Sequence, residues 1–168
     1  YVAFSVESAL HALNKLGYPA ILKPVIGSWG RMVSPLLEYM SSRALLEIVN
    51  EMGPLYKIFY LQEMVNKPQR DIRTFVIGEE VVAGIYRYAK PGEWRTNTAR
   101  GGRAEVCKLT DELVDLSLRA AEAVGGGILG IDIMESERGL LVHEVNSTIE
   151  FKNTVPVTGV DIPKLIIN

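Results

Sequence analysis

A hairpin pattern near the end of the chain constrains the fold more than any other segment of the sequence. Two runs of strand-forming residues, 129–134 and 140–146, flank a turn centred near Arg138. That spacing sets an antiparallel register in which Asp132 lies beside Glu144. The sequence therefore predicts two carboxylates facing each other across neighbouring strands.

Directly opposed carboxylates destabilise a hairpin unless a cation lies between them. Asn146 follows Glu144 by two positions and shares its face, because side chains alternate along a strand. Oxygen-only ligands suit a hard cation such as Mg²⁺. We interpret Asp132, Glu144 and Asn146 as candidate magnesium ligands; the alternative is a solvated hairpin whose acidic side chains point to water.

The rest of the chain alternates between helical periodicity and strand-like runs. Ser5 and Thr110 are suited to cap helices that end at glycines, and a third helix is predicted over residues 41–52. Strands are predicted over residues 20–25, 58–65, 72–77 and 81–88, the last two forming a hairpin around Gly78. Interleaved helices and antiparallel hairpins indicate an α+β fold.

Composition excludes several classes of protein. The formal net charge of -2 over 168 residues gives no basic field for nucleic acid. The sequence contains no apolar run of the roughly 20 residues that a membrane span needs. A single cysteine, Cys107, and the lack of zinc-ligand spacing fit a reducing cytoplasm. We expect a cytoplasmic protein that binds neither nucleic acid nor membrane.

A glycine-rich segment follows the strand predicted at residues 20–25. Its sequence is Gly27-Ser28-Trp29-Gly30-Arg31, and Lys23 precedes it on the strand. Exposed backbone N–H groups of such a loop can hold phosphate oxygens, with the lysine as a point charge. The segment is neither a Walker A motif nor a Rossmann fingerprint, and its alternative interpretation is a plain surface hairpin.

Several cations lie in or near the central hairpin. Asp71 and Arg73 are two apart on one strand and share a face. Arg87, Arg95 and Arg100 lie in the hairpin and the polar segment after it, where they could neutralise a transferring phosphate. Taken singly, each arginine is more often a solvated surface charge.

Taken in order, these segments resemble the ATP-grasp superfamily over residues from about 20 to 160. The resemblance is strongest to the branch that contains the ribosomal protein S6 glutamate ligase and, within it, to ligases acting on the amino-group carrier protein of lysine and arginine biosynthesis. The residues that carry it are Ile21-Leu22-Lys23-Pro24, the loop 27–31, Gln62-Glu63, Asp71-Ile72-Arg73, Glu93 to Asn97, Gly101-Gly102, Asp132 and Glu144-Val145-Asn146. Residues 97–102, 146–153 and 158–163 are the marks of the carrier ligases.

The resemblance implies an ATP-grasp fold with two α+β lobes. Residues 1–65 would form the small lobe with the phosphate loop, and residues 66–168 the large lobe with the metal site. The family carries an amino-terminal domain before this region, with a further nucleotide-binding lysine, that is missing from this chain. Since the chain starts at Tyr1 and stops in an apolar stretch, we expect it to be a piece of a longer protein.

The resemblance also implies roles for individual residues. ATP would be bound by Lys23, Gly27, Ser28, Trp29, Gly30, Gln62, Glu63, Met64, Val65 and Asp71. Arg73, Arg95 and Asn97 would act on the γ-phosphate and the acyl phosphate, and Asp132, Glu144 and Asn146 would hold magnesium, with two ions expected. We place the acidic substrate at Arg87, Arg100 and Asn146, because arginine pairs with carboxylates in bidentate fashion.

The implied activity is an ATP-dependent carboxylate–amine ligase. It would activate the terminal glutamate of an acidic amino-group carrier protein and join it to the amine of glutamate or 2-aminoadipate. The two amino acids differ by one methylene, and the sequence leaves both open. The alternatives are an S6-type peptide glutamate ligase and a non-catalytic ATP-binding module. We also expect a homo-oligomer.

Overall fold

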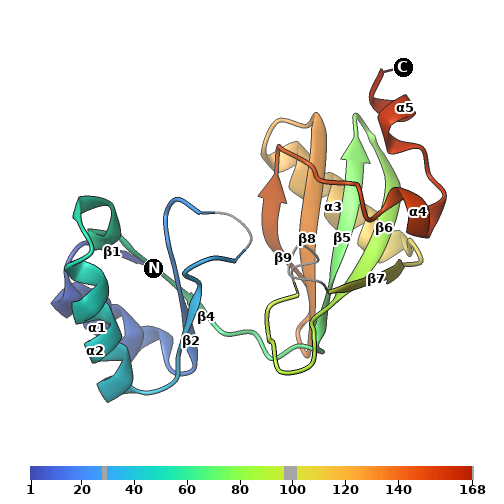
Figure 1. The fold of residues 1–168 in the computed structure, drawn as a ribbon. Coiled ribbons are helices and arrows are strands. Elements are labelled where there is room, and N and C mark those ends of the chain that lie inside the picture. The colour runs from blue at the N-terminus through green and yellow to red at the C-terminus, as the bar shows by residue number, and fades with distance from the viewer. Residues whose placement is uncertain (28–29, 97–101, 168) are drawn as a thin grey trace. The chain divides into compact units, whose positions relative to one another are not determined.

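The computed structural model describes residues 1–27, 30–96 and 102–167. Its chain divides into two compact units, Tyr1–Val65 and Asn66–Asn168 (Figure 1). Each unit has its own sheet, in which all neighbouring strands are antiparallel, and its own apolar core. The mixture of helices and antiparallel strands confirms the predicted α+β fold class.

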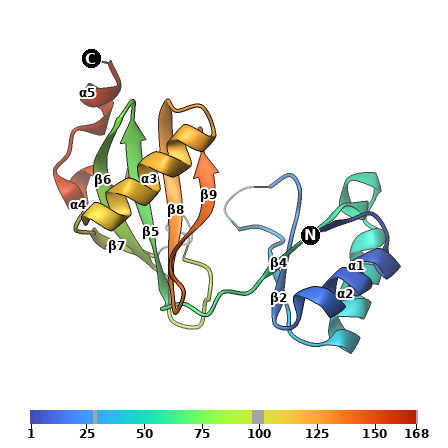
Figure 2. The same ribbon diagram turned by 180° about the vertical axis from the view of Figure 1, so that it is seen from behind.

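The first unit packs two helices against a four-stranded sheet of order β1-β4-β2-β3. Its elements are β1 (Val2–Ala3), α1 (Val6–Leu16), β2 (Ala20–Lys23), β3 (Ser34–Leu36), α2 (Tyr39–Asn50), a 3-10 turn at Pro54–Lys57 and β4 (Phe59–Glu63). Both helices lie on the same side of the sheet (Figure 2). Leu13 and Leu46 from the helices share one fully buried cluster with Phe59 and Leu61 from β4.

Helix α1 begins and ends where the sequence predicts. The Ser5 side chain accepts the Ser8 N–H, and the Ser8 hydroxyl accepts the Ser5 N–H, which completes a capping box. Gly17 follows the helix with a φ of 88°, a conformation that glycine adopts at little cost. The strand predicted over residues 20–25 ends at Lys23, just before Pro24, which has no N–H to donate to a ladder.

The second unit is built on a five-stranded sheet of order β7-β6-β5-β8-β9. Its elements are β5 (Arg70–Ile77), β6 (Glu80–Tyr88), β7 (Arg103–Val106), α3 (Asp111–Ala123), β8 (Ile128–Ser136), β9 (Gly139–Asn146), α4 (Val155–Thr158) and α5 (Ile162–Ile167). Helix α3, which Thr110 caps as predicted, covers one face of the sheet. Helices α4 and α5 lie on the opposite side (Figures 1 and 2).

The two faces of this sheet bury different side chains. Ile131 and Ile133 pack into the core beneath α3, whereas Phe75 and Ile85 share a second cluster with Ile162 of α5. Because side chains alternate along a strand, Asp71 and Arg73 of β5 and Arg87 of β6 share the face of Phe75 and Ile85. The α4–α5 segment thus covers the apolar side chains of this face, and the charged side chains of Asp71, Arg73 and Arg87 lie on the same face.

The predicted register of the final hairpin is confirmed for the part that lies far from the turn, before the register shift. Asp132 is the Cα partner of Glu144, and Gly130 is the partner of Asn146. A β-bulge follows directly, so that Ile133 pairs with Val142 and the register shifts by one residue. The bulge was not predicted, and bulges commonly re-aim side chains next to functional sites.

No helix in the described ranges combines the length and apolar character that a membrane span requires. The longest, α3, has 13 residues.

Candidate active site

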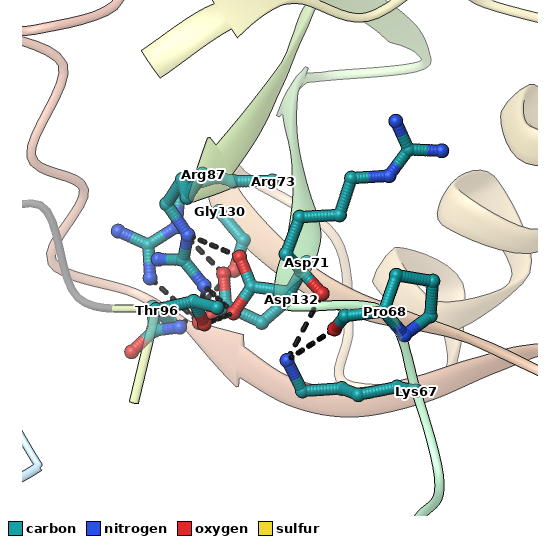
Figure 3. Close-up of polar contacts among 10 residues, drawn as sticks. Lys67, Pro68, Asp71, Arg73, Arg87, Thr96, Gly130 and Asp132 are labelled. Carbon is teal, nitrogen blue, oxygen red and sulfur yellow. Dashed lines mark hydrogen bonds and ion pairs between the residues drawn. The ribbon is translucent and has the colours of Figure 1, made fainter. Parts of the chain in front are cut away.

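Two cross-strand ion pairs lie side by side on the open face of the second sheet (Figure 3). Asp71 and Arg87 are Cα partners across β5 and β6, and Arg73 and Asp132 are partners across β5 and β8. Arg87 donates from Nε and Nη2 to the two Asp71 oxygens at 2.6 and 2.9 Å. Arg73 donates in the same way to Asp132 at 2.6 and 2.8 Å. Both pairs have the bidentate geometry that gives arginine its specificity for carboxylates.

The two pairs are joined to each other and to a loop. Arg87 Nη2 lies 3.0 Å from Asp132 Oδ2, and the Thr96 hydroxyl donates to Asp71 Oδ2. We call Asp71, Arg73, Arg87, Thr96 and Asp132 the charged network. Its two carboxylates and two guanidinium groups balance in charge, which makes the burial of Asp71, Arg87 and Asp132 tolerable.

Most of the charged network is buried. Asp71 and Asp132 are each 5% exposed, and Arg87 is 8% exposed. Burial acts to raise the pKa of the Asp132 carboxyl, but the charges and hydrogen bonds of Arg87 and Arg73 outweigh it and lower that pKa below its ordinary value. Burial likewise acts to lower the pKa of Arg87, and the Asp132 and Asp71 carboxylates reverse the effect and raise it. Both shifts favour the ionised forms of Asp132 and Arg87.

Gly130 lies next to this arrangement. A Cβ at that position would lie 3.4 Å from Ile149 Cγ2 and 3.9 Å from the Cδ and Nε atoms of Arg73, so the Arg73 side chain passes directly over the Gly130 backbone. The Asn146 amide donates to the Gly130 carbonyl at 3.4 Å. The sequence analysis missed Gly130, although glycine inside a strand pattern is a known sign of close approach.

The three predicted magnesium ligands come from the facing strands β8 and β9. Asp132 and Glu144 are opposed, and Asn146 is two residues further along β9 on the same face. The carboxylate and amide oxygens of this set fit a hard cation. Asp132 pairs with Arg73 and Arg87 here, and no cluster of three acidic, histidine or cysteine ligands exists within the described ranges. The metal assignment stays a prediction.

The substrate role predicted for Arg87 also stays a prediction. Its guanidinium is already bonded to two carboxylates of the chain itself, which suits a group that positions its neighbours. The contact with ATP predicted for Asp71 likewise stays a prediction; in the structure its carboxylate pairs with Arg87.

The predicted phosphate loop connects two antiparallel strands of the first unit. Lys23 ends β2, and its Nζ lies 5.8 Å from the centre of the Tyr60 ring. Gly30 has a φ of 63°, which other residues rarely adopt, and a Cβ on Gly27 would lie 3.0 Å from Pro24 Cγ. Ser28 and Trp29 lie outside the described residues.

The predicted ATP-binding residues 62–65 form the end of the first unit. Gln62 and Glu63 pair with Ile21 and Ala20 across β4 and β2. The Met64 N–H donates to the Pro19 carbonyl at 3.2 Å, and Val65 is the last residue of the unit. Contact of these residues with ATP stays a prediction.

Arg95 belongs to the segment between β6 and β7. It donates from Nε and Nη2 to the Glu93 carboxylate at 3.0 and 3.1 Å. Asn97 and Arg100, also predicted to act on phosphate and substrate, lie outside the described residues. Thr96, to which sequence reasoning gave no role, joins this segment to the charged network.

The two α+β units, each with an antiparallel sheet, and the paired carboxylates and arginines on one sheet face agree with the ATP-grasp fold that the sequence resembles. A model of the RimK-like ATP-grasp domain matches residues 2–168, and the chain belongs to this family. In fold, it is similar to a RimK domain ATP-grasp protein from Sphaerobacter thermophilus, with a TM-score of 0.78, 21% identity and coverage of 99% of this chain and 58% of the other.

Among curated proteins, the chain is 46% identical over 168 residues to an alpha-aminoadipate–LysW ligase from Sulfurisphaera tokodaii, covering 99% of this chain and 59% of the relative. It is 34% identical to a glutamate–LysW ligase from Sulfolobus acidocaldarius, covering 99% of this chain and 60% of the relative. The chain thus spans about three-fifths of the length of these relatives.

Proposed function

We propose that the protein is an ATP- and magnesium-dependent ligase that joins the amine of 2-aminoadipate to the carboxyl-terminal glutamate of an amino-group carrier protein. The observation that carries the proposal is the 46% identity, over almost the whole of this chain, to an alpha-aminoadipate–LysW ligase. Glutamate is the second candidate substrate, supported by the 34% identity to a glutamate–LysW ligase.

The proposed reaction has two steps. An oxygen of the carrier's γ-carboxylate attacks the terminal phosphorus of ATP, the bond to the bridging oxygen breaks, and an acyl phosphate and ADP result. The amine nitrogen of the amino acid then attacks the acyl carbon, the carbon–oxygen bond to phosphate breaks, and the nitrogen loses a proton as the amide forms. No side-chain nucleophile is required, which agrees with a single cysteine, Cys107, that is buried.

The chain's residues supply position and charge for these steps. We propose that Lys23 and the loop from Gly27 to Gly30 hold the ATP phosphates and that Arg73 and Arg95 stabilise the negative oxygens of the transferring group. Asp132, Glu144 and Asn146 would hold magnesium, with two ions proposed. When bound, magnesium would neutralise phosphate charge and orient the oxygens.

Arg73 is the residue best supported in this role. Its guanidinium pairs with the predicted metal ligand Asp132 through two hydrogen bonds, at 2.6 and 2.8 Å. The side chain is therefore already held at the edge of the predicted metal site. A positioned cation contributes to catalysis because its orientation costs nothing further when charge develops on the substrate.

The two other candidate functions are distinguished by their acceptors. An S6-type ligase would extend a ribosomal peptide, and a non-catalytic module would bind ATP and transfer nothing. We further propose that the reaction takes place in the cytoplasm; a homo-oligomeric state stays a prediction.

Mass spectrometry of the carrier protein tests the proposal. The natural full-length protein is incubated with ATP, Mg²⁺ and the carrier, and with 2-aminoadipate or glutamate separately. We expect a mass increase of one aminoadipate residue, and the glutamate product would be lighter by one methylene. An unmodified carrier in both reactions, with ADP formation absent, contradicts the proposal.

The variant Glu144→Gln tests the metal assignment within the same assay. It removes one ligand charge and leaves the side-chain volume unchanged, so we expect turnover to be lost with the fold retained. Val142→Thr, at an exposed β9 position beyond the bulge, is the matched control and should remain active. Normal activity of Glu144→Gln at the same magnesium concentration would remove Glu144 from the metal site.

A further inference from the structure

The segment between β6 and β7 has a well-defined local structure up to Arg95. The Glu93 carboxylate accepts the backbone N–H groups of Trp94 and Arg95 at 3.0 and 3.1 Å as well as the Arg95 guanidinium. These hydrogen bonds, first those from the Arg95 side chain, lower the pKa of Glu93 to about 2. Such contacts within three consecutive residues shape the segment, but they do not fix where it lies on the sheet.

Thr96 connects the segment to the sheet. It is 7% exposed, and its hydroxyl bonds to Asp71, which is 25 positions away in the sequence (Figure 3). The Thr96 hydroxyl is the donor of this bond, and Asp71 Oδ2 accepts it. Both oxygens of Asp71 are held by Arg87 at 2.6 and 2.9 Å, so that the acceptor itself cannot rotate away.

The attachment point is part of the charged network. Arg87 contacts Asp132 at 3.0 Å, and Asp132 pairs with Arg73. One chain of hydrogen bonds therefore connects Thr96 on the loop with β5, β6 and β8. Thr96 directly follows Arg95, and consecutive Cα atoms are about 3.8 Å apart, so fixing Thr96 restricts the position of the Arg95 backbone.

We propose that Thr96 is a positioning residue that, through its hydroxyl bond to Asp71, holds the Arg95 segment at the place where phosphate is transferred. The proposal rests on the proposed function for the role of Arg95. Displacement of a catalytic group by about 1 Å can cost on the order of 100-fold in rate. Loss of the hydroxyl should therefore lower kcat more than it changes the KM for ATP.

The decisive variant is Thr96→Val in the full-length protein, which removes the hydroxyl and keeps the shape. We expect kcat to fall by about 10- to 100-fold, with the KM for ATP nearly unchanged. Thr96→Ser keeps the hydroxyl and should restore most of the rate. If Thr96→Val does not fold, Thr96→Ala takes its place in the comparison with Thr96→Ser.

Thr74→Val is the matched control. Thr74 is fully buried in the same unit, and its hydroxyl bonds to Ser117 at 2.8 Å on the α3 face, away from the charged network. It should lose some stability and keep kcat. A kcat for Thr96→Val no lower than that of Thr74→Val, or equal rates for Thr96→Ser and Thr96→Val, would overturn the proposal.

A second measurement does not depend on turnover. The sequence has two tryptophans, so that in a Trp29→Phe background fluorescence reports on Trp94 alone. We expect Thr96→Val to lower the fluorescence anisotropy of Trp94, and Thr74→Val to leave it unchanged. If the protein without substitutions does not modify the carrier, the proposed function is wrong. The anisotropy measurement still tests the positioning role of Thr96 in that case, and an unchanged Trp94 anisotropy in Thr96→Val would contradict it.

Discussion

The two units bury different kinds of side chain. Within residues 1–27 and 30–65, the first unit buries one polar side chain, that of Ser42, among leucines, alanines and a phenylalanine. The described part of the second unit buries three charged side chains, Asp71, Arg87 and Asp132. Both units have an antiparallel sheet and an apolar core, so the buried charge is not needed to form this kind of fold.

The comparison indicates which part of the molecule is constrained by something other than stability. Replacing a buried ion pair by apolar residues often leaves stability unchanged or raises it, whereas removing one partner is costly. Departures from the simplest core are expected at functional sites. The second unit has such a departure at the network formed by Asp71, Arg73, Arg87, Thr96 and Asp132.

The largest effect should come from leaving one buried charge without its partner. Arg87→Met removes the cation that Asp71 and Asp132 share, and we expect it to destabilise the second unit by about 3–5 kcal/mol. Urea unfolding followed by the reactivity of Cys107, which is 3% exposed in this unit, measures the change.

Arg119→Met is the control, because its partner Asp115 is exposed on α3 and the pair should contribute no more than about 1 kcal/mol. If Arg87→Met and Arg119→Met unfold at the same urea concentration, removing one partner of the buried ion pairs costs no more stability than removing one partner of a surface ion pair.

A slightly smaller effect is expected in the first unit. Leu46 is fully buried in its apolar cluster, and Leu46→Ala should cost about 2–5 kcal/mol by lost burial and the cavity left behind. Circular dichroism should show an earlier loss of α1 and α2. The urea concentration at which Cys107 reacts should not change; a parallel decrease would mean that the two cores do not unfold separately.

Acid should produce the smallest and most selective effect. The folded pKa of Asp132 lies below its ordinary value of 3.8, so this carboxylate stabilises the fold above that value, and its contribution is lost as pH falls through the folded pKa. Glu38, which caps α2, also has a lowered pKa because of hydrogen bonds from Ser41, but it is solvent-exposed.

Hydrogen exchange measured between about pH 5 and pH 2.5 should therefore show β5 and β8 losing protection before β2 and β4. Asp132→Asn should remove this difference in pH dependence. Simultaneous loss of protection in both sheets, with no change in the variant, would show that Asp132 does not determine the acid sensitivity of the second unit.

Local signals in the sequence predicted much of the fold. The caps at Ser5 and Thr110, the central hairpin and the pairing of Asp132 with Glu144 follow from periodicity, turn chemistry and strand alternation. The short strands β1, β3 and β7 and the helices α4 and α5 were not predicted. These five elements are two to six residues long, too short to establish a period of their own, and tertiary contacts define them.

The candidate site was predicted only in part, because local patterns specify pairs within a hairpin but not contacts between distant strands. The register of the central hairpin places Asp71 opposite Arg87 by the same argument that places Asp132 opposite Glu144. The sequence therefore contained the information for this pair, although it was not used. The contact between Arg87 and Asp132 depends on β8 adding to the other edge of β5, which no local pattern specifies. The same holds for Thr96, whose partner Asp71 lies on a distant strand.

The bulge in the final hairpin has a consequence for how insertions and deletions act in this family. Leu140 and Val145 both pack on the α3 core. They are five residues apart, and in a regular strand an odd separation would place them on opposite faces. The extra residue at the bulge, His143, reverses the alternation between them. Deleting His143 would turn Leu140 outward or force Glu144 toward the core. A change in the length of the 136–139 turn would spare the carboxylates, because the bulge separates them from it. Natural length variation is therefore expected at the turn and not at position 143.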